Sequence, residues 1–261
     1  MNGNTGQEYC ENQVKHHDRD RYLTALFSPA DRRPGLFALY AFNLEVAKIR
    51  EMVSEPLLGQ IRLQWWREAL EGIYGGAPRR HLVVEPLAET IHRYHLPQVA
   101  FEVLIDWRER DLNDEAPETL DDLIAYAAGT SSTLVSLALQ TLGVGEDEIA
   151  AHDTGYHVGI AWALAGLLRA RPQHADQGRN YLPAGLVADY GEKGAIRHVA
   201  ATALEHLSAA RAARKNLPKA ALPALLPAVL AGRHLRRQGR APTTSAMDQL
   251  ALYLHAFTGR Y

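Results

Sequence analysis

Apolar residues recur at a helical period along most of this chain, and that spacing limits the fold more than any other feature of the sequence. Leu36, Leu39, Tyr40 and Val46, with Asn43 between them, follow an i, i+3, i+4 progression. Side chains spaced in this way lie on one face of an α-helix. No segment shows the alternation of apolar and polar residues that is typical of a half-buried strand. The sequence therefore predicts an all-α protein.

Turn-forming residues divide this pattern into separate helices. Ser28 can cap the free N–H groups at a helix start and Pro29 suits the first helical position, so the first strong helix is expected to begin there. Thr119 and Asp122 form a capping-box pattern at the start of a long apolar segment. Further helices are expected at about residues 57–74, on both sides of Leu96-Pro97, and at about residues 120–142, 147–169, 184–216 and 247–257.

The chain is expected to form one domain. It has 261 residues, contains no repeat of fixed period and has no Gly/Ser linker long enough to separate two halves. Residues 1–261 are therefore interpreted as a single multi-helix bundle with a central cavity between facing helices, and residues 1–17 as a flexible N-terminus. Gly155, Gly159 and Gly166 are small enough for a neighbouring helix or a ligand to approach their helix closely.

Composition narrows the classes of function. A formal charge of -2 gives no general attraction to nucleic acid, so no nucleic-acid partner is expected. Cys10 is the single cysteine, which excludes a disulfide framework and fits a reducing, cytoplasmic location. The first twenty residues lack the apolar core of a signal peptide and are too acidic for a transit peptide.

Four short motifs follow one another between residues 21 and 191. They are Tyr40-Ala41-Phe42, Leu63-Gln64-Trp65-Trp66-Arg67-Glu68, Ala128-Gly129-Thr130 and Gly178-Arg179-Asn180-Tyr181-Leu182-Pro183. Together they resemble the squalene/phytoene synthase family. The resemblance implies the all-α isoprenoid synthase fold and, in the enzymes, head-to-head joining of prenyl diphosphates. It also implies two aspartate-rich motifs that face each other across the cavity and hold the Mg²⁺ that neutralises the departing diphosphate.

Both aspartate-rich motifs depart from the family pattern in this chain. In the first, Ala47 and Lys48 stand in place of the paired aspartates and only Glu51 is a carboxylate. In the second, the two aspartate positions fall on Ala170 and His174. A site with one carboxylate does not suit a hard divalent cation. The resemblance therefore implies no metal site, no cofactor and no catalytic residue, and Mg²⁺ is expected only if the chain is an active prenyltransferase.

Some residues that face the diphosphate in the enzymes are retained. Arg169 and Tyr181 match an arginine and a tyrosine on the diphosphate side, and Tyr40 matches a tyrosine at the mouth of the cavity. The resemblance implies that these three residues form what remains of an anion-binding pocket.

The same departures occur in one branch of the family, the squalene/phytoene synthase-like assembly factors of mitochondrial complex I and their bacterial relatives. The residues that carry this closer resemblance include Phe37-Ala38-Leu39, Val53-Ser54-Glu55, Leu168-Arg169-Ala170 and Pro218-Lys219-Ala220. It implies a pseudoenzyme that supports complex I assembly or stability, with complex I subunits or other assembly factors as partners. It also implies a location at the inner membrane, on the matrix side in a eukaryote. The alternatives are an active prenyltransferase and a carrier that holds an isoprenoid or lipid ligand in the retained cavity.

Other polar clusters have less specific interpretations. An acidic cluster ends one predicted helix and is interpreted as a solvated charged face. Its members are Asp106, Glu109, Asp111, Asp114 and Glu115. Arg67 is expected to pair with Glu71 one turn further along its own helix. Asp153 and His157 share a helix face at a spacing that suits a transition metal, but two ligands without a third favour an ordinary polar face.

A strongly apolar segment, residues 220–232, is followed by a basic run. This combination suits either the surface of an anionic membrane or a buried helix with an exposed basic end, and the sequence leaves both alternatives open. Pro223 and Pro227 interrupt the apolar segment, which is also too short to cross a bilayer. Peripheral membrane contact is thus one of two expectations for this part of the chain.

Overall fold

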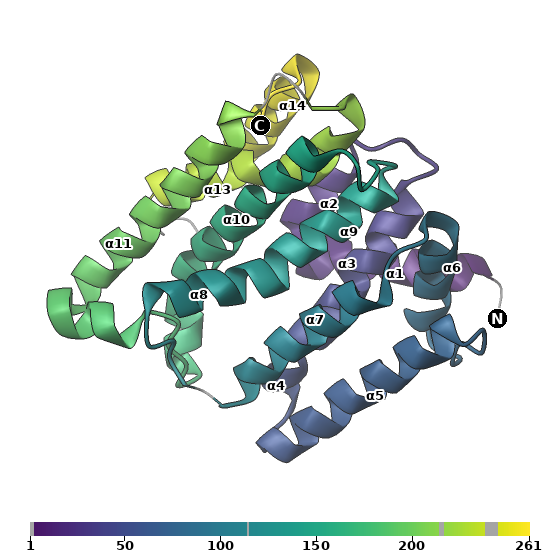
Figure 1. Ribbon diagram of the computed structural model, residues 1–261, viewed down its shortest axis with the longest axis horizontal. Coiled ribbons are helices and arrows are strands. Elements are labelled where there is room, and N and C mark those ends of the chain that lie inside the picture. The colour runs from purple at the N-terminus through teal and green to yellow at the C-terminus, as the bar shows by residue number, and fades with distance from the viewer. Residues whose placement is uncertain (1–2, 114, 214–216, 238–244) are drawn as a thin grey trace.

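The structure is a computed structural model that describes residues 3–113, 115–213, 217–237 and 245–261. Every regular element in these ranges is a helix (Figure 1), which confirms the all-α prediction. The α-helices are α1 (Gly3–His17), α2 (Arg19–Ala25), α3 (Arg33–Ala47), α4 (Ile49–Met52), α5 (Pro56–Tyr74), α6 (Val84–Tyr94), α7 (Gln98–Glu109), α8 (Leu120–Ala127), α9 (Thr133–Thr141), α10 (Ile149–Asp176), α11 (Ala184–Ala212), α12 (Leu222–Leu225), α13 (Pro227–Arg236) and α14 (Ala246–Thr258). Two 3-10 helices, η1 (Arg110–Asn113) and η4 (Lys219–Ala221), and one π-helical turn, η2 (Ala128–Ser132), complete the described elements.

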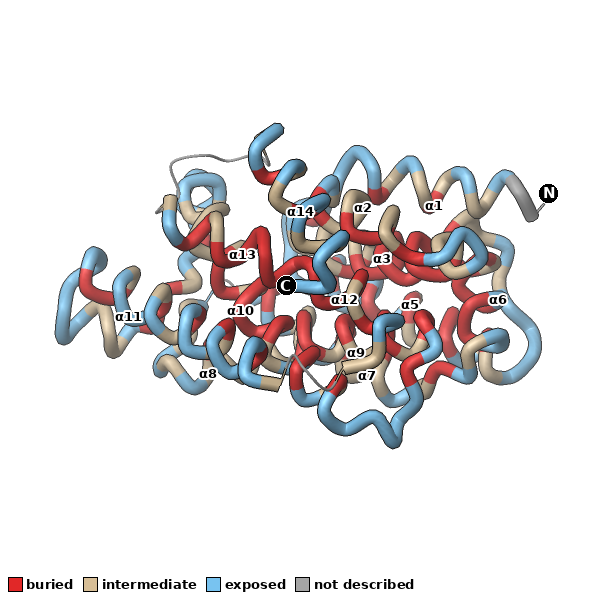
Figure 2. Tube along the Cα trace, turned by 90° about the horizontal axis from the view of Figure 1, so that it is seen from above, coloured by how far each residue is buried: buried red, intermediate tan, exposed pale blue. Residues whose placement is uncertain are grey.

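The long helix α10 runs through the middle of the bundle. It packs against α8, η2, α9, α11 and α13, and its buried residues include Val158, Ala161 and Leu164. Figure 2 shows that buried residues gather along α3, α10 and α13, with exposed residues on the outer helices. Because α10 also carries Ala170 and His174, the packing of the core sets the position of one expected half of the site.

Small residues on α10 allow close approach of a neighbouring helix. A Cβ atom at Gly159 would lie 2.4 Å from the Cα of Ser132 in η2, and one at Gly155 would lie 2.8 Å from the Leu139 side chain of α9. A Cβ atom at Gly166 would meet nothing within 4 Å. The first two glycines therefore serve helix packing, whereas Gly166 borders open space.

Local sequence signals set several helix ends as expected. Helix α5 begins at Pro56 and ends at Tyr74, and Thr119 forms a capping box with Asp122 at the start of α8. The apolar segment at residues 120–142 is less regular than predicted, because η2 separates α8 from α9. Helix α10 extends to Asp176, past the predicted end, and contains Pro172.

Two expectations for the N-terminal part were wrong. The Ser28 hydroxyl does not cap α3; it donates to the carbonyl of Ala25 at 2.6 Å at the end of α2, and α3 begins at Arg33. Most of residues 1–17, expected to be flexible, form helix α1. Cys10 and Val14 are fully buried in the core, and this apolar contact with α3 and α6 holds α1 in place.

The apolar segment at residues 220–232 lies inside the protein. Leu225, Leu226 and Leu230 are at most 1% exposed, so the structure favours a buried helix over a membrane-binding one for this segment. A different stretch, Leu120–Thr141, is long and apolar enough to cross a membrane by length and composition alone. It is 61% buried, as expected of a core segment.

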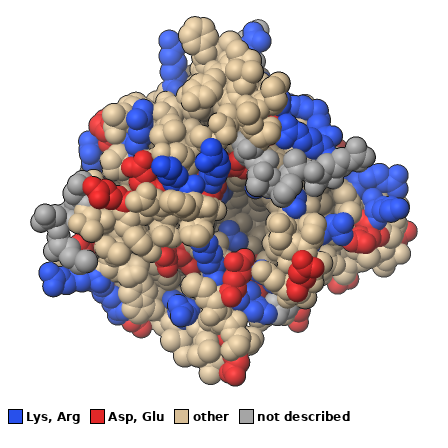
Figure 3. All heavy atoms as spheres, turned by 180° about the vertical axis from the view of Figure 1, so that it is seen from behind, with Lys and Arg blue, Asp and Glu red and all other residues tan. Residues whose placement is uncertain are grey.

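Charged side chains of both signs are mixed on the face shown in Figure 3. This mixture agrees with the formal charge of -2 for the whole chain. It gives that face no extended area of one sign that would attract a polyanion such as nucleic acid.

Candidate functional site

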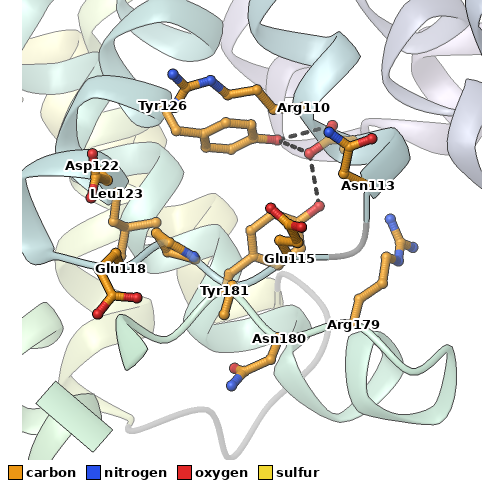
Figure 4. A pocket seen from close by; sticks show the side chains of 13 residues that line it. Arg110, Asn113, Glu115, Glu118, Asp122, Leu123, Tyr126, Arg179, Asn180 and Tyr181 are labelled. Carbon is orange, nitrogen blue, oxygen red and sulfur yellow. Dashed lines mark hydrogen bonds between the residues drawn. The ribbon is translucent and has the colours of Figure 1, made fainter. Parts of the chain in front are cut away.

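A cavity of about 380 Å³ opens between η1, the start of α8 and the loop that follows α10 (Figure 4). Local sequence signals position its walls. The capping box at Thr119 starts α8, so that Asp122 and Tyr126 line the cavity one helical turn apart. Gly178 has a φ of +72°, and the chain turns there so that the backbone N–H of Arg179 donates to the carbonyl of His174 at 2.8 Å. The turn directs residues 179–181 to the cavity wall.

A buried carboxylate, Asp111, is the centre of the polar network in this cavity. Its side chain is 6% exposed and accepts from the Tyr126 hydroxyl at 2.8 Å and from the Tyr181 hydroxyl at 2.9 Å. The Arg108 guanidinium lies 3.2 Å from the same carboxylate and 2.7 Å from the Tyr126 hydroxyl. The dashed lines in Figure 4 show both tyrosines directed at one carboxylate. Three donors satisfy the buried charge.

The two tyrosines act as hydrogen-bond donors because both are protonated. Burial raises the pKa of Tyr126 well above its ordinary value; the positive charge of Arg108 opposes this shift and the negative charge of Asp111 adds to it. Burial followed by Asp111 raises the pKa of Tyr181 in the same way. Phenols held neutral beside a carboxylate stabilise its charge, and they do not act as bases near neutral pH.

The rim of the site brings the two expected metal motifs together. Glu51 on α4 lies 3.5 Å from Arg179, whose side chain is 8% exposed and also contacts Gln177. The His174 ring lies 4.8 Å from the Tyr181 ring. Burial, and then the Arg179 charge, lower the pKa of His174, so that its imidazole is neutral near pH 7.

The remaining motif positions carry no metal ligand. Ala47 ends α3 and Lys48 follows it, with the pKa of the Lys48 amine lowered by burial. Ala170 lies one turn before His174 on α10. The donor set is thus one ion-paired carboxylate, one neutral imidazole and one amine, which does not fit Mg²⁺ because that ion requires several hard oxygen ligands.

The three expected anion-binding residues lie in two different clusters. Tyr181 lines the cavity with Asp111, whereas Arg169 lies 2.9 Å from Asp20 and 3.3 Å from the His234 ring. Burial followed by the Arg169 charge lowers the pKa of His234, so the neutral ring accepts from the guanidinium. The Arg169 guanidinium therefore forms an ion pair with the buried Asp20 carboxylate of α2 and does not face the cavity around Asp111.

Tyr40 belongs to the cluster around Arg169. Burial raises the pKa of its hydroxyl to about 12, and the Arg21 guanidinium lies 5.8 Å from the centre of its ring. Arg21 and Arg169 both lie 5.8 Å from the ring centre of Trp162. Aromatic rings surround these two arginines, and each pairs with its own carboxylate, Arg21 with Asp18 and Arg169 with Asp20.

Other expected pairings differ from the structure. Arg67 binds Asp106 and Glu109 of α7 at 2.8 Å each, and not Glu71, because α5 and α7 pack side by side. The interpretation of the acidic cluster as a solvated face was wrong for Asp111, which is buried, and Asp114 lies outside the described residues. These contacts join residues that are far apart in the sequence.

His157, which was considered with Asp153 as a metal-ligand pair, contacts another histidine in the structure. The Nδ1 atom of His157 lies 2.8 Å from the Nδ1 atom of His206 on α11. Within residues 3–113, 115–213, 217–237 and 245–261, no three His, Cys, Asp or Glu side chains gather closely enough to hold a metal ion. The His157 ring instead joins α10 to α11 through one shared proton.

Sequence reasoning missed four residues of the site: Arg108, Asp111, Tyr126 and Arg179. Two of them were within reach of a local signal. Tyr126 stands two residues before the Ala128-Gly129-Thr130 motif, and Arg179 lies inside the Gly178–Pro183 motif. Asp111 had no such signal, because its tyrosine partners lie 15 and 70 residues away in the chain.

Comparison with known proteins places the chain in a family. The sequence profile of squalene/phytoene synthase matches residues 14–255. The chain belongs to the squalene/phytoene synthase family. This confirms the resemblance seen in the four motifs.

Two relatives within this family are complex I assembly factors. The chain is 31% identical to the NADH dehydrogenase (ubiquinone) complex I, assembly factor 6 of Bos taurus, over 97% of this chain and 82% of the bovine protein. It is 32% identical to the protein of the same name from Homo sapiens, over 85% of this chain and 70% of the human protein. These similarities confirm the predicted kinship with the assembly-factor branch.

The fold is that of the family's enzymes. A crystal structure of a dehydrosqualene synthase in complex with a ligand superposes with a TM-score of 0.78 over 98% of this chain and 96% of that one, at 16% sequence identity. The isoprenoid synthase architecture is thus confirmed. At this identity the likeness concerns the fold alone.

Proposed function

We propose that this chain is a catalytically inactive member of the squalene/phytoene synthase family that supports the assembly or stability of respiratory complex I. The observation that carries the proposal is the state of Glu51, the one carboxylate among the five expected metal positions. Its carboxylate is half-exposed and lies 3.5 Å from the Arg179 guanidinium, so these five positions offer Mg²⁺ a single anionic ligand. A prenyltransferase needs such metal ions to neutralise the departing diphosphate.

The relatives support the second half of the proposal. Identity of 31% and 32% to two complex I assembly factors extends over most of the chain. We propose that its partners are complex I subunits or other assembly factors, and that it works in the cytoplasm, at the inner face of the membrane that holds complex I. Asp111, Tyr126 and Tyr181 already satisfy one another's hydrogen bonds, so this network supports the wall of the pocket and does not supply a free acid or base.

Gene deletion followed by rescue tests this proposal. Deletion is expected to lower both the amount of assembled complex I, seen on native gels, and NADH:quinone oxidoreductase activity in membranes. Expression of the wild-type chain should restore both. Normal assembly and normal activity in the deletion strain would contradict the proposal.

The variant Glu51→Gln separates an assembly role from metal-dependent catalysis. Glutamine keeps the size of the side chain and an acceptor for Arg179 but removes the negative charge that a metal would need. Full rescue by Glu51→Gln is expected. Glu55→Gln, at an exposed position between α4 and α5, is the matched control. If Glu51→Gln abolishes rescue at a normal protein level while Glu55→Gln does not, the carboxylate has a chemical role and the pseudoenzyme proposal is wrong.

The cavity itself favours a second candidate, a prenyl-diphosphate enzyme or an isoprenoid or lipid carrier. Its volume of about 380 Å³ and the buried Arg179 guanidinium suit a ligand with an anionic head. Incubation with farnesyl or geranylgeranyl diphosphate and Mg²⁺ should release diphosphate only if the chain is an enzyme. Native mass spectrometry should reveal a co-purified apolar ligand only if it is a carrier.

A further inference from the structure

The last helix, α14, presents an apolar face to solvent. Its large exposed side chains are Met247, Leu250, Tyr253, Leu254 and Phe257, with exposed fractions of 62%, 50%, 60%, 59% and 93%. Positions 247, 250, 254 and 257 follow one side of a helix. Single exposed apolar residues are ordinary on a protein surface, but a continuous stripe on one helix marks a binding surface.

The opposite side holds α14 firmly against the protein. Leu252 is 1% exposed, and the Asp248 side chain is fully buried between Arg233 and Arg237 of the α13 region. Ser245 and Asp248 also form a capping box at the start of the helix. Because these contacts fix the orientation of α14, the apolar stripe on its other side faces solvent.

Arginine side chains gather near the C-terminal end of α14. Asp248 is the one acidic residue of α14, and its two arginine partners neutralise it. Arg211 lies 3.4 Å from the main-chain oxygen of Tyr261, just beyond α14, and both Arg211 and Arg236 approach Gly232. Burial, and then the nearby charge of Arg236, lower the pKa of Arg211, while Tyr261 opposes the shift.

The figures agree with this arrangement. Helix α14 forms the top of the molecule in Figure 1, and the same edge in Figure 3 consists of uncharged atoms with Lys or Arg side chains on either side. The apolar surface continues into a groove of about 100 Å³ between α2 and α14. Phe27 and Tyr253 meet there edge to face at 5.3 Å.

We propose that α14 is a membrane-docking helix that places its apolar stripe in the headgroup region of an anionic bilayer. An amphipathic helix with an apolar face and basic neighbours binds such a surface in this way. A coiled-coil partner is disfavoured because α14 has 13 residues, whereas that contact needs three or more heptads. The proposal concerns a surface far along the chain from Glu51 and does not depend on the proposed function.

Vesicle flotation tests the proposal with the full chain. The protein is expected to float with vesicles of phosphatidylcholine containing about one third phosphatidylglycerol, and much less with phosphatidylcholine alone. Absence of binding to the anionic vesicles at low salt would overturn the proposal. This result and the complex I phenotype are read independently, so either can fail alone.

Two pairs of variants locate the contact. The double variant Leu254→Glu/Phe257→Glu should lower the partition coefficient about tenfold or more. Its matched control is Leu57→Glu/Ile61→Glu on α5, where the exposed fractions are 61% and 58%, and it should bind like the wild type. Equal loss in both variants, or no loss in the α14 variant, would contradict the proposal. Circular dichroism should show the same helix content for all of these proteins, since the four positions are exposed.

A charge variant tests the second half of the contact. Arg260 is exposed just beyond the end of α14, and Arg236 is exposed on α13. Arg236→Gln/Arg260→Gln should weaken binding to anionic vesicles, and the wild type should lose the same part of its affinity at high salt. Arg62→Gln/Arg80→Gln, also exposed, is the control and should bind normally. If Leu254→Glu/Phe257→Glu instead abolishes a dimer seen by analytical ultracentrifugation and the wild type ignores vesicles, α14 is a protein interface and the proposal fails.

Discussion

Asp111 is the residue on which the site depends, because three side chains donate to it and it pairs with the neighbouring Arg108. The Arg108 side chain is 18% exposed and has no other carboxylate within hydrogen-bonding distance among the described residues. Substitution Asp111→Asn is expected to lower the free energy of unfolding by about 3–5 kcal/mol, since it leaves a largely buried cation unpaired. Urea denaturation measures this change.

The matched control for that substitution is Asp106→Asn. Asp106 also pairs with an arginine, Arg67, but its side chain is 64% exposed. The expected loss is no more than about 1 kcal/mol, because water screens the pair. Equal losses for the two variants would show that burial of Asp111 does not set the strength of its network.

Asp248 should make stability depend on pH in the acid range. Hydrogen bonds from Arg237 and Arg233 outweigh the effect of burial and hold the pKa of this carboxyl well below its usual range. A depressed folded-state pKa stabilises the protein fully above about pH 5, and the stabilisation is lost as pH falls through the unfolded value near 4 and below. Denaturation midpoints at pH 3 to 6 should therefore fall with pH in the wild type and fall less in Asp248→Asn. Parallel curves for the two proteins would contradict the assignment.

Among single residues, local contacts were predictable and distant ones were not. Thr119 and Asp122 cap α8 as expected, because the whole motif lies within four residues. Asp111 was predicted to be solvated because its sequence neighbours are charged, whereas its partners Tyr126 and Tyr181 come from other elements. Arg67 likewise pairs with Asp106 of another helix, α7, and not with Glu71 of its own helix. Side-chain pairing across helices depends on packing that a single sequence does not display.

At the scale of elements, two glycines on neighbouring helices should respond in opposite directions to the same substitution. A Cβ atom at Gly129 in η2 would lie 2.0 Å from Cδ1 of Trp107, so Gly129→Ala should lower the free energy of unfolding by about 1–3 kcal/mol through overpacking. Gly166 on α10 has nothing within 4 Å of such an atom. Gly166→Ala should raise stability by about 0.5–1 kcal/mol, because alanine loses less backbone entropy in a helix.

Thermal unfolding measured side by side for the two glycine variants tests this contrast. Destabilisation by Gly166→Ala would mean that the space beside it is filled in solution, for example by a bound ligand or a partner. Tolerance of Gly129→Ala would mean that Trp107 moves freely. The sequence predicted close approach along α10 but not which glycine provides it.

Element boundaries show the same limit. The end of α10 was predicted near residue 169, yet the helix continues through Pro172 to Asp176. Loss of one hydrogen bond at the proline is small beside the burial of a helix that packs against several others. Ser28 and Pro29 match the sequence pattern of a helix start, but the Ser28 hydroxyl bonds the carbonyl of Ala25 at the end of α2, and α3 begins only at Arg33.

For the whole molecule, the helical period was sufficient to predict the all-α class, and the four motifs were sufficient to predict the family. The docking of α1 was not predictable, because its surroundings in the sequence are polar. Its two anchoring residues, Cys10 and Val14, are separated by one turn and gain their burial from α3 and α6. The burial of two apolar residues one turn apart cannot be predicted until the helices that cover them are placed.

The burial of Cys10 has a practical consequence, since it is the single cysteine of the chain. Burial raises the pKa of its thiol to about 12, so at pH 8 only about one thiol in ten thousand is the reactive thiolate. Iodoacetamide should label the native protein very slowly and the urea-unfolded protein completely, as mass spectrometry would show. Rapid stoichiometric labelling of the native protein would contradict the packing of α1. Because the chain has a single thiol, the labelling rate measures how often α1 detaches from the bundle and exposes Cys10.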